Sequence, residues 1–343
     1  MSEDSQHRVD IISVPTEAGT HIPGQCKAPD WIIEQGGLAR KLRDNAGCHV
    51  AIHGECENGI FGTKIEDANS WKPSEKVEGA RNLPNTVKVM HWVHDYLRSQ
   101  NDMGSTFPII LGGDCSITPA IFSAFSHWHP NKKVGLLYVD GDADLTLPSQ
   151  TSAEGSSGIL DSMVISHLTR REGGLEQMKD FSHPDGSALV NPENVVLFGF
   201  DPLQPATEHW VYLLENGFKC FTRPSVQKDP IGCARKALAY LEDRVNIILL
   251  HFDVDVIDCG LFPLANYPHY AGLRFKNATG SVGHFLQHEK VQGLVVTEVN
   301  PNNDSVAHRN VQKGDERVTM VERLVDELVL SFKKRLSDQQ KQS

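Results

Sequence analysis

The sequence predicts an α/β fold of three layers, in which helices cover both faces of a mostly parallel central sheet. Short runs of β-branched and other apolar residues recur along the chain, each bounded by Gly, Pro, Asn or Asp. The runs are continuously hydrophobic rather than alternating, which is typical of strands buried on both faces. Amphipathic helical patterns separate them, and this order of elements indicates βαβ units.

The expected strands are residues 9–14, 107–111, 134–139, 195–198, 247–252 and 293–299. Helices are expected over residues 85–98 and 316–336, where apolar side chains recur three and four positions apart. The polar residues 337–343 are expected to form a frayed tail. Because no repeat or linker divides the chain, we expect one domain over residues 1–343 with its core at about 9–335.

The charge and the cysteines exclude several classes of protein. The chain has 33 Lys and Arg against 44 Asp and Glu, a formal net charge of −11, whereas binders of nucleic acid or anionic membranes need a basic surface. No apolar run approaches the length of a membrane span, and residues 1–10 do not have the pattern of a signal peptide. Seven scattered cysteines without a CxxC pair are typical of reduced thiols, so we expect a cytoplasmic protein.

Acidic and thiol side chains follow four of the expected strands. The sequences at these strand ends are Gly-Gly-Asp-Cys-Ser (112–116), Asp-Gly-Asp-Ala-Asp (140–144), Asp-Val-Asp (253–255) and Glu-Val-Asn-Pro (298–301). Ligands of open parallel sheets bind beyond the carboxyl ends of the strands, and all four groups lie there.

The acidic residues of two of these groups are spaced two positions apart, which places their side chains on one side of extended backbone. Asp140, Asp142 and Asp144 can therefore converge, as can Asp253 and Asp255. Carboxylates gathered in one crevice repel one another unless a cation neutralises them. Their oxygens suit hard cations such as Mn²⁺ or Mg²⁺, and two ions can share bridging carboxylates. A metal site is predicted, with turn formation or helix capping as the alternative role of each Asp.

These segments resemble the arginase (ureohydrolase) family, which includes arginases, agmatinases and formiminoglutamases. The family's GGDHS is GGDCS here, its DAHAD is DGDAD, its SFDVDxxD is HFDVDVID at residues 251–258, and its EVNP is intact at 298–301. The resemblance covers nearly the whole chain. It implies the three-layer arginase fold and assembly of identical chains into trimers or hexamers.

The resemblance also implies two divalent metal ions, with manganese as the first expectation. A hydroxide bound to these ions would attack the carbon of a guanidinium or similar group. Carried over by position, the ligands of one ion are Cys115, Asp140, Asp144 and Asp253, and those of the other are Asp140, Asp142, Asp253 and Asp255. Glu298 matches the acid that pairs with the substrate guanidinium. A carboxylate and a planar cation form a bidentate, charge-assisted pair.

Both histidine ligands of the family are replaced, one by Cys115 and the other by Asp142. Each replacement can still bind a metal, and the thiol favours softer ions such as Fe or Zn. The new ligand set leaves an excess of negative charge over two divalent ions, which raises the pKa of a bound water. The site can relieve this excess if the thiol stays protonated, if a higher-valent ion is held, or if a cationic substrate binds. His251 stands where the family has a small residue, and either a pocket-lining or a packing role is open.

The substrate loop departs from the family too. SGNLHG becomes SGILDS at residues 157–162, so Ser157 is kept, while Ile159 replaces an amide that holds the amino-acid end of arginine. Asp161 replaces a histidine that moves protons or contacts substrate. A carboxyl can do acid–base work when its pKa is raised, and a structural role is the alternative. Free arginine is therefore not the expected substrate.

These observations favour a metal-dependent hydrolase that cleaves a C–N bond in a small cationic guanidino or amidino compound, with modified arginine as one candidate. Asp144, Asp161 and Glu298 are expected to act in catalysis, and Ser157, Asp161 and Glu298 to contact the substrate. The competing hypothesis is a catalytically degenerate member of the family with a binding or regulatory role. A third, a thiol enzyme without metal, depends on Cys115 alone and needs a base to activate it.

Overall fold

The structure is a computed structural model that describes residues 8–54, 76–100, 103–151, 155–183, 185–303 and 319–342. A sheet of eight strands has the order β2-β1-β5-β10-β9-β6-β7-β8, and each neighbouring pair in it is parallel. Its strands are β1 (Arg8–Val14), β2 (His49–His53), β5 (Phe107–Gly112), β6 (Val134–Val139), β7 (Val195–Phe198), β8 (Lys219–Phe221), β9 (Ile247–Asp253) and β10 (Val291–Thr297). A small antiparallel pair, β3 (Lys76–Val77) and β4 (Ala80–Arg81), lies outside this sheet.

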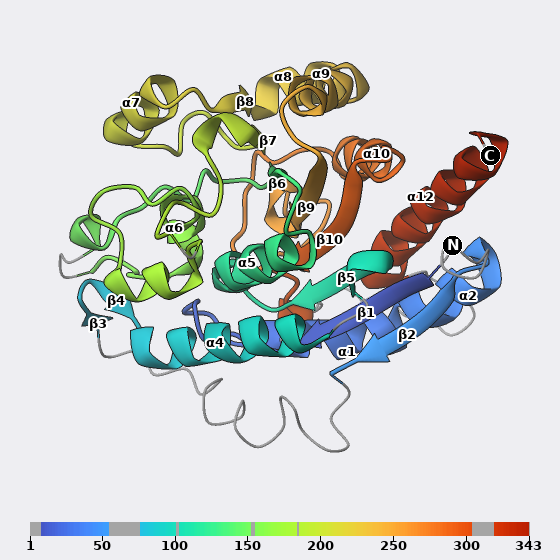
Figure 1. The fold of residues 1–343 in the computed structure, drawn as a ribbon, viewed down its shortest axis with the longest axis horizontal. Coiled ribbons are helices and arrows are strands. Elements are labelled where there is room, and N and C mark those ends of the chain that lie inside the picture. Colours follow the sequence, from blue (N-terminus) through green and yellow to red (C-terminus); the bar gives the residue numbers. More distant parts are fainter. Residues whose placement is uncertain are drawn as a thin grey trace.

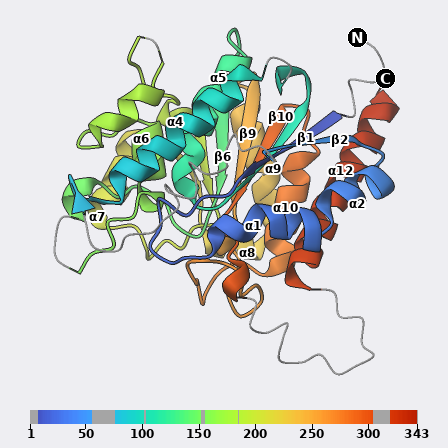
Figure 2. The same ribbon diagram turned by 90° about the horizontal axis from the view of Figure 1, so that it is seen from below.

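Helices cover both faces of the sheet (Figures 1 and 2). One layer contains α4 (Leu83–Ser99), α5 (Thr118–Trp128) and α6 (Val164–Leu168), and the other contains α1 (Ala28–Asp30), α2 (Leu38–Ala46), α9 (Pro230–Glu242), α10 (Phe275–Leu286) and α12 (Met320–Gln342). Buried side chains form a separate hydrophobic cluster on each face of the sheet. The predicted three-layer α/β fold with a parallel sheet is confirmed.

All six expected strands form, at positions 9–14, 107–111, 134–139, 195–198, 247–252 and, shifted toward the N-terminus, 291–297. β2 and β8 were not predicted. They are the two edges of the sheet, and partly exposed side chains break the continuous apolar pattern of the buried strands.

The two expected helices are α4 and α12, although the C-terminal boundary predicted for α12 was wrong. Residues 337–342, expected to fray, continue this helix to Gln342, because Gln and Lys are good helix formers and no Gly or Pro stops them. Residues 316–318 and 343 of these predictions lie outside the described residues.

The four strands that carry the acidic and thiol groups are neighbours at the centre of the sheet, in the order β5-β10-β9-β6. Since they are parallel, their carboxyl ends meet at one edge. The turn after β5 is held tightly, because a Cβ atom on Gly113 would lie only 1.5 Å from the carbonyl oxygen of Thr16. Only glycine allows β5 to end this close to the loop that follows β1.

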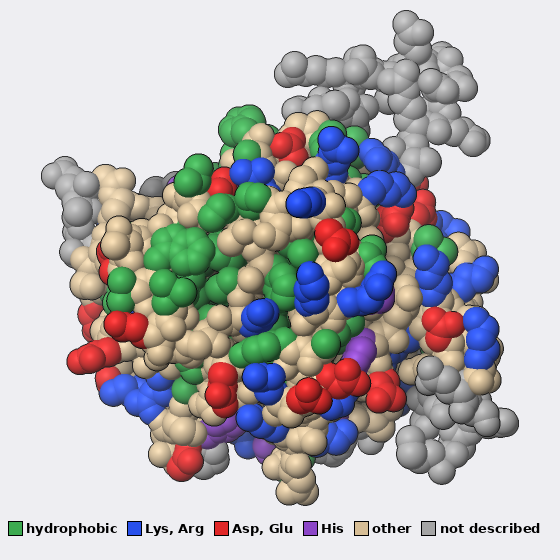
Figure 3. Space-filling view, turned by 90° about the horizontal axis from the view of Figure 1, so that it is seen from above, with side chains coloured by type: hydrophobic (Ala, Val, Ile, Leu, Met, Phe, Trp, Pro, Cys, Tyr) green, Lys and Arg blue, Asp and Glu red, His purple; other side chains and the backbone are tan. Residues whose placement is uncertain are grey.

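The surface is mixed in character. Figure 3 shows hydrophobic side chains among charged ones on the face that carries α7 (Thr207–Glu215) and α8 (Arg223–Lys228). Leu203 and Leu214 are among the exposed large apolar residues of this region. The six cysteines in the described part of the chain are free thiols, as expected. Within the described ranges, every helix is too short or too polar to cross a membrane.

Candidate metal centre

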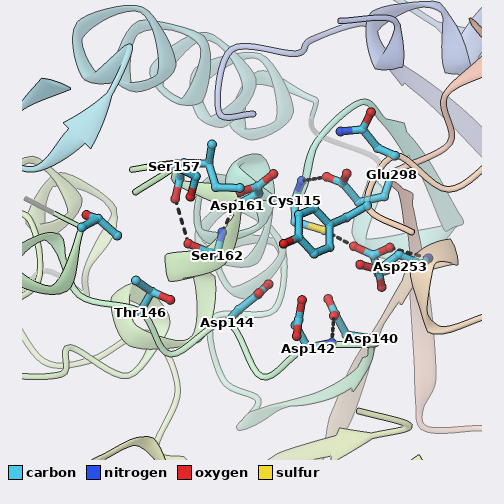
Figure 4. A pocket seen from close by; sticks show the side chains of 15 residues that line it. Cys115, Asp140, Asp142, Asp144, Thr146, Ser157, Asp161, Ser162, Asp253 and Glu298 are labelled. Atoms are coloured by element: carbon cyan, nitrogen blue, oxygen red, sulfur yellow. Dashed lines mark hydrogen bonds between the residues drawn. The ribbon is translucent and has the colours of Figure 1, made fainter. Parts of the chain in front are cut away.

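The carboxyl ends of the central strands border a pocket of about 230 Å³ (Figure 4). All the site residues expected from the sequence line it: Cys115, Asp140, Asp142, Asp144, Ser157, Asp161, Asp253, Asp255 and Glu298. In Figure 4, Ser157 and Asp161 lie on one side of the pocket, and Cys115, Asp253 and Glu298 lie on the other. Residues that are far apart in the sequence therefore share one cavity.

The first group of candidate metal ligands surrounds Cys115. Cys115, Asp140, His251 and Asp253 each place one ligand atom within 4.8 Å of the others, and all four are buried. The Sγ atom of Cys115 donates to Oδ2 of Asp253 at 2.7 Å and lies 3.3 Å from Nε2 of His251. Burial, together with the neighbouring carboxylates, raises the pKa of this thiol well above its usual value. A protonated thiol is a poor nucleophile, which disfavours the metal-free thiol enzyme.

The second group consists of Asp142, Asp255 and His269, again with ligand atoms within 4.8 Å of one another. Nε2 of His269 lies 3.4 Å from Oδ2 of Asp142 and 3.4 Å from Oδ2 of Asp255. Burial lowers the pKa of His269, but its contacts with the two carboxylates outweigh this and raise the pKa to about 11. Asp142 and Asp255 therefore stabilise a positive charge placed between them.

Backbone hydrogen bonds orient the aspartates. Oδ1 of Asp140 accepts from the N–H of Asp142 at 2.6 Å, and Oδ1 of Asp253 accepts from the N–H of Asp255 at 2.8 Å. Asp255 is held in the same way by the N–H of Gly141 at 2.9 Å. One oxygen of each carboxylate is thus fixed by a backbone N–H. The other oxygen is unpartnered in Asp140, accepts from the thiol of Cys115 in Asp253, and lies 3.4 Å from Nε2 of His269 in Asp255.

The buried acids of the pocket, and one carboxylate oxygen without a hydrogen-bond partner, are suited to binding a cation. Burial first, and then the neighbouring acids, raise the pKa values of Asp140, Asp144 and Asp253 well above the usual range. Oδ2 of Asp140 is buried and has no hydrogen-bond partner, a costly state unless something else binds it. Carboxylates, a thiol and imidazoles are ligands of Mn, Fe and Zn, so the residues present fit divalent metal ions.

Asp144 and Glu298 have strained backbones, with φ angles of +48° and +65° in the left-handed region. Such strain is concentrated at functional sites in proteins. Asp144 lies outside both groups of candidate ligands, and its carboxylate accepts a hydrogen bond from the hydroxyl of Tyr138. It lines the same pocket and points into it (Figure 4).

Glu298 and Asp161 are the two other acids of the pocket. Oε1 of Glu298 accepts from the N–H of Cys115 at 3.0 Å, and Oε2 accepts from the side-chain amide of Gln25. Asp161 accepts from the N–H of Ser162 at 2.8 Å, and burial raises its pKa well above the usual value. A carboxyl with a raised pKa can carry a proton near neutral pH.

Two histidines of the site were missed or left open by sequence reasoning. His251 carried a signal, because it stands two residues before Asp253 on the same strand and therefore on the same face. His269 carried none, because it lies in a loop far from Asp142 in the sequence. Asn266 and Tyr267, from the same loop as His269, line the pocket and were not predicted, whereas the two histidines lie behind the acids that line it.

The sequence profile of the Arginase family matches residues 7–320. The chain belongs to the arginase family. It is 26% identical over 302 residues to an arginase of Staphylococcus aureus, covering 88% of this chain and 92% of that protein. It is 24% identical over 297 residues to human arginase-1, covering 86% and 85% of the two chains.

Solved structures share the arginase fold at lower identity. Arginase from Entamoeba histolytica, in complex with L-ornithine, superposes with a TM-score of 0.75 at 17% identity, over 95% of this chain and 98% of that one. Formimidoylglutamase from Bacillus subtilis gives a TM-score of 0.65 at 15% identity, over 97% and 88%. As a member of the arginase family, the chain has a hydrolase fold, and it carries two groups of candidate metal ligands in which both motif histidines are replaced.

Proposed function

We propose that this arginase-family protein is a metal-dependent hydrolase that cleaves a C–N bond in a cationic guanidino or amidino compound. The observation that carries the proposal is the pocket itself, in which Glu298 lies directly beside the candidate metal ligand Cys115. A cation-binding acid and a metal group at one cavity are the two parts that such a reaction needs.

Two divalent ions would be held by the six positions that match the family ligands: Cys115, Asp140, Asp142, Asp144, Asp253 and Asp255. Manganese is the family's metal, and the thiol adds iron or zinc as alternatives. When bound, such ions supply a water that is activated near neutral pH and stabilise the charge that develops on the attacked group.

The chain's own residues supply orientation and proton transfer. Glu298 binds the guanidinium as a bidentate pair, and its hydrogen bonds to Cys115 and Gln25 fix its direction. Asp161, with its raised pKa, gives a proton to the departing amine. Asp144, held by Tyr138, accepts a proton from the water, and Ser157 contacts the substrate from the opposite wall.

The lining of the pocket favours a substrate other than free arginine. None of the described residues that line it is Lys or Arg, so the described wall offers no cation to a carboxylate. Ile159 presents an apolar surface to the pocket where the family has an amide. A guanidino or amidino compound with a modified or missing amino-acid end fits this wall better than arginine does.

A catalytically degenerate protein is the second candidate function. The replacement of both motif histidines, by Cys115 and Asp142, and of the loop histidine, by Asp161, favours it. Such a protein would keep the acidic pocket and bind cationic ligands without turnover. We also expect a homo-oligomer, a trimer or hexamer, located in the cytoplasm, which light scattering and cell fractionation would test.

Product release from a panel of substrates separates the two candidates. Protein loaded with Mn²⁺, Fe²⁺ or Zn²⁺ is incubated with arginine, agmatine, hydroxyarginine, guanidinobutyrate and formiminoglutamate, and urea or formamide is measured. We expect turnover of at least one of these compounds other than arginine, lost in Asp253→Ala and kept in Asp326→Asn, a surface acid on α12. Binding without turnover of any compound, with every metal, would favour the degenerate protein.

A further inference from the structure

Each group of candidate ligands contains one histidine, and neither histidine stands at a position where the family motifs have one. His251 lies beside Cys115, which replaces the first motif histidine, with 3.3 Å between Nε2 and Sγ. His269 lies beside Asp142, which replaces the second, with 3.4 Å between Nε2 and Oδ2. An imidazole is therefore present at both places from which the motif lost one.

His251 is placed as a metal-ligating histidine is. It is fully buried and stacks on Tyr138, its cross-strand neighbour on β6, with ring centroids 4.4 Å apart and an interplanar angle of 14°. Its Nδ1 atom lies 3.2 Å from Oγ1 of Thr118. A partner on one ring nitrogen fixes the tautomer and directs the other nitrogen, here Nε2, toward the ligand group.

His269 occupies space that Gly141 leaves open. A Cβ atom on Gly141 would lie 2.6 Å from Cδ2 and 2.8 Å from Nε2 of His269, closer than any real contact of that kind. The family motif has alanine at this position and histidine at the next, whereas this chain has Gly141 and Asp142. The two changes together exchange a motif histidine for one that reaches the same place from the loop.

Each of the two groups contains a buried polar atom without a hydrogen-bond partner of good geometry. His269 is only 7% exposed, and its Nε2 atom has no hydrogen-bond partner of good geometry, although it points between two carboxylates. Asp140, in the first group, is 2% exposed, and its buried Oδ2 atom also lacks a partner. A bound cation would satisfy such atoms, which lie among the carboxylates of the two groups.

We propose that His251 and His269 are metal ligands, so that each imidazole lost from the motifs is replaced by one delivered from another segment. This inference rests on the proposed function, because it needs metal ions at this pocket. One site then has a thiolate, an imidazole and carboxylates, and the other has an imidazole and carboxylates only. The first set suits softer ions such as Fe or Zn, and the second suits Mn, so the pocket can hold two different metals.

Cobalt titration of the full-length, metal-stripped protein tests this assignment. Co²⁺ reports on each site through its absorption spectrum, and a thiolate ligand adds a charge-transfer band. Bound Co²⁺ and Mn²⁺ are counted by elemental analysis after desalting. The variants are His251→Phe, which keeps the aromatic stack, His269→Ala, Gly141→Ala and Thr118→Val, with the exposed His127→Ala as the control.

We expect two ions per chain in the wild type and in the control. His269→Ala and Gly141→Ala lose one ion and keep the thiolate band, although Gly141→Ala changes no ligand. His251→Phe lowers the Co²⁺ affinity of the thiolate site. Thr118→Val lowers this affinity by about 10-fold, the usual effect of removing a residue that hydrogen-bonds to a metal ligand. If His251→Phe does not fold, Thr118→Val and Gly141→Ala decide.

Two results would overturn the assignment of the histidines as ligands, and only one of them would also overturn the proposed hydrolase function. If all variants bind two ions with wild-type affinity and spectra, the histidines are not ligands, and the proposed hydrolase function stands. If the wild type binds neither Co²⁺ nor Mn²⁺, the assignment and the proposed function both fail.

Discussion

The carboxylate of Glu298 accepts a hydrogen bond from the backbone N–H of Cys115, with 3.0 Å between Oε1 and N. These two residues follow neighbouring strands, β10 and β5, whose pairing fixes the distance between them. The acid proposed to bind the substrate cation is therefore tied to the chain segment that carries a proposed metal ligand. Movement of either strand end would disturb both parts of the site.

Replacing Glu298 with Gln removes the charge that is proposed to bind the substrate and keeps the size of the side chain. We expect kcat/KM to fall by about 100-fold or more, since a charge-assisted bidentate pair becomes a neutral contact. Metal content should not change. Steady-state kinetics and elemental analysis check this, with the exposed Glu193→Gln as the control. An unchanged kcat/KM would remove Glu298 from the substrate site.

Exchanging two residues should restore the arrangement of the family motifs. In Cys115→His, a second ring is crowded against His251, whose Nε2 lies 3.3 Å from the present Sγ, and in His251→Ser a proposed ligand is lost. We expect each single change to weaken Co²⁺ binding by about 10-fold or more, and the double variant to recover most of the affinity. Additive losses in the double variant would show that positions 115 and 251 do not act together.

The turn that carries Cys115 also depends on the close approach of two backbone segments, at Gly113 and Thr16. Gly113→Ala forces a Cβ atom against the Thr16 carbonyl, so we expect the free energy of unfolding to fall by about 3 kcal/mol or more. Gly280→Ala is the matched control, because it lies within α10 with open space around it, and it should stabilise the chain by up to about 1 kcal/mol. Urea denaturation measures both, and equal stability of the two variants would contradict this account.

Stability should fall in mild acid because of histidines buried in the neutral form away from the pocket. Burial lowers the pKa of His167 to about 3, whereas the unfolded chain titrates this residue near 6.5. Between these values the unfolded state binds more protons, so the stability contributed by His167 is lost as the pH falls. From pH 7 to pH 5 this loss is about 2 kcal/mol.

The wild type should therefore lose more stability than His167→Gln over this pH range. Urea denaturation at pH 7 and pH 5 gives the difference in free energy of unfolding between the two proteins, which we expect to shrink by about 2 kcal/mol on acidification. His127→Gln, at an exposed position, is the control for replacing a histidine. A constant difference for His167→Gln as well would mean that this imidazole binds protons alike in the folded and unfolded chains, so that burial does not lower its pKa.

The sequence was sufficient for the fold class and for the location of the pocket. Buried parallel strands such as β6 and β9 are continuously apolar, and the motif residues at their ends lie where parallel strands direct them. The edge strands β2 and β8 escaped prediction because their side chains are partly exposed. Nor does a pattern along the chain specify which strands become neighbours, as β5 and β10 do.

Some of the candidate ligands could be predicted from local spacing, and others could not. Asp140, Asp142, Asp253 and Asp255 follow from i, i+2 spacing at strand ends. His269 enters from a loop, and the space it fills is visible only when Gly141 is seen against it. Contacts between distant segments depend on how the loops pack over the sheet, which local spacing does not encode.

The number of metal ions bound to the purified protein tests the central claim most directly. After incubation with Mn²⁺, Fe²⁺ or Zn²⁺ and desalting, elemental analysis should find about two ions per chain in the wild type. Asp253→Ala should lose them, because Asp253 belongs to the first ligand group and touches Cys115. Protein that binds none of these ions under any condition would contradict the assignment of this pocket as a metal-dependent hydrolase site.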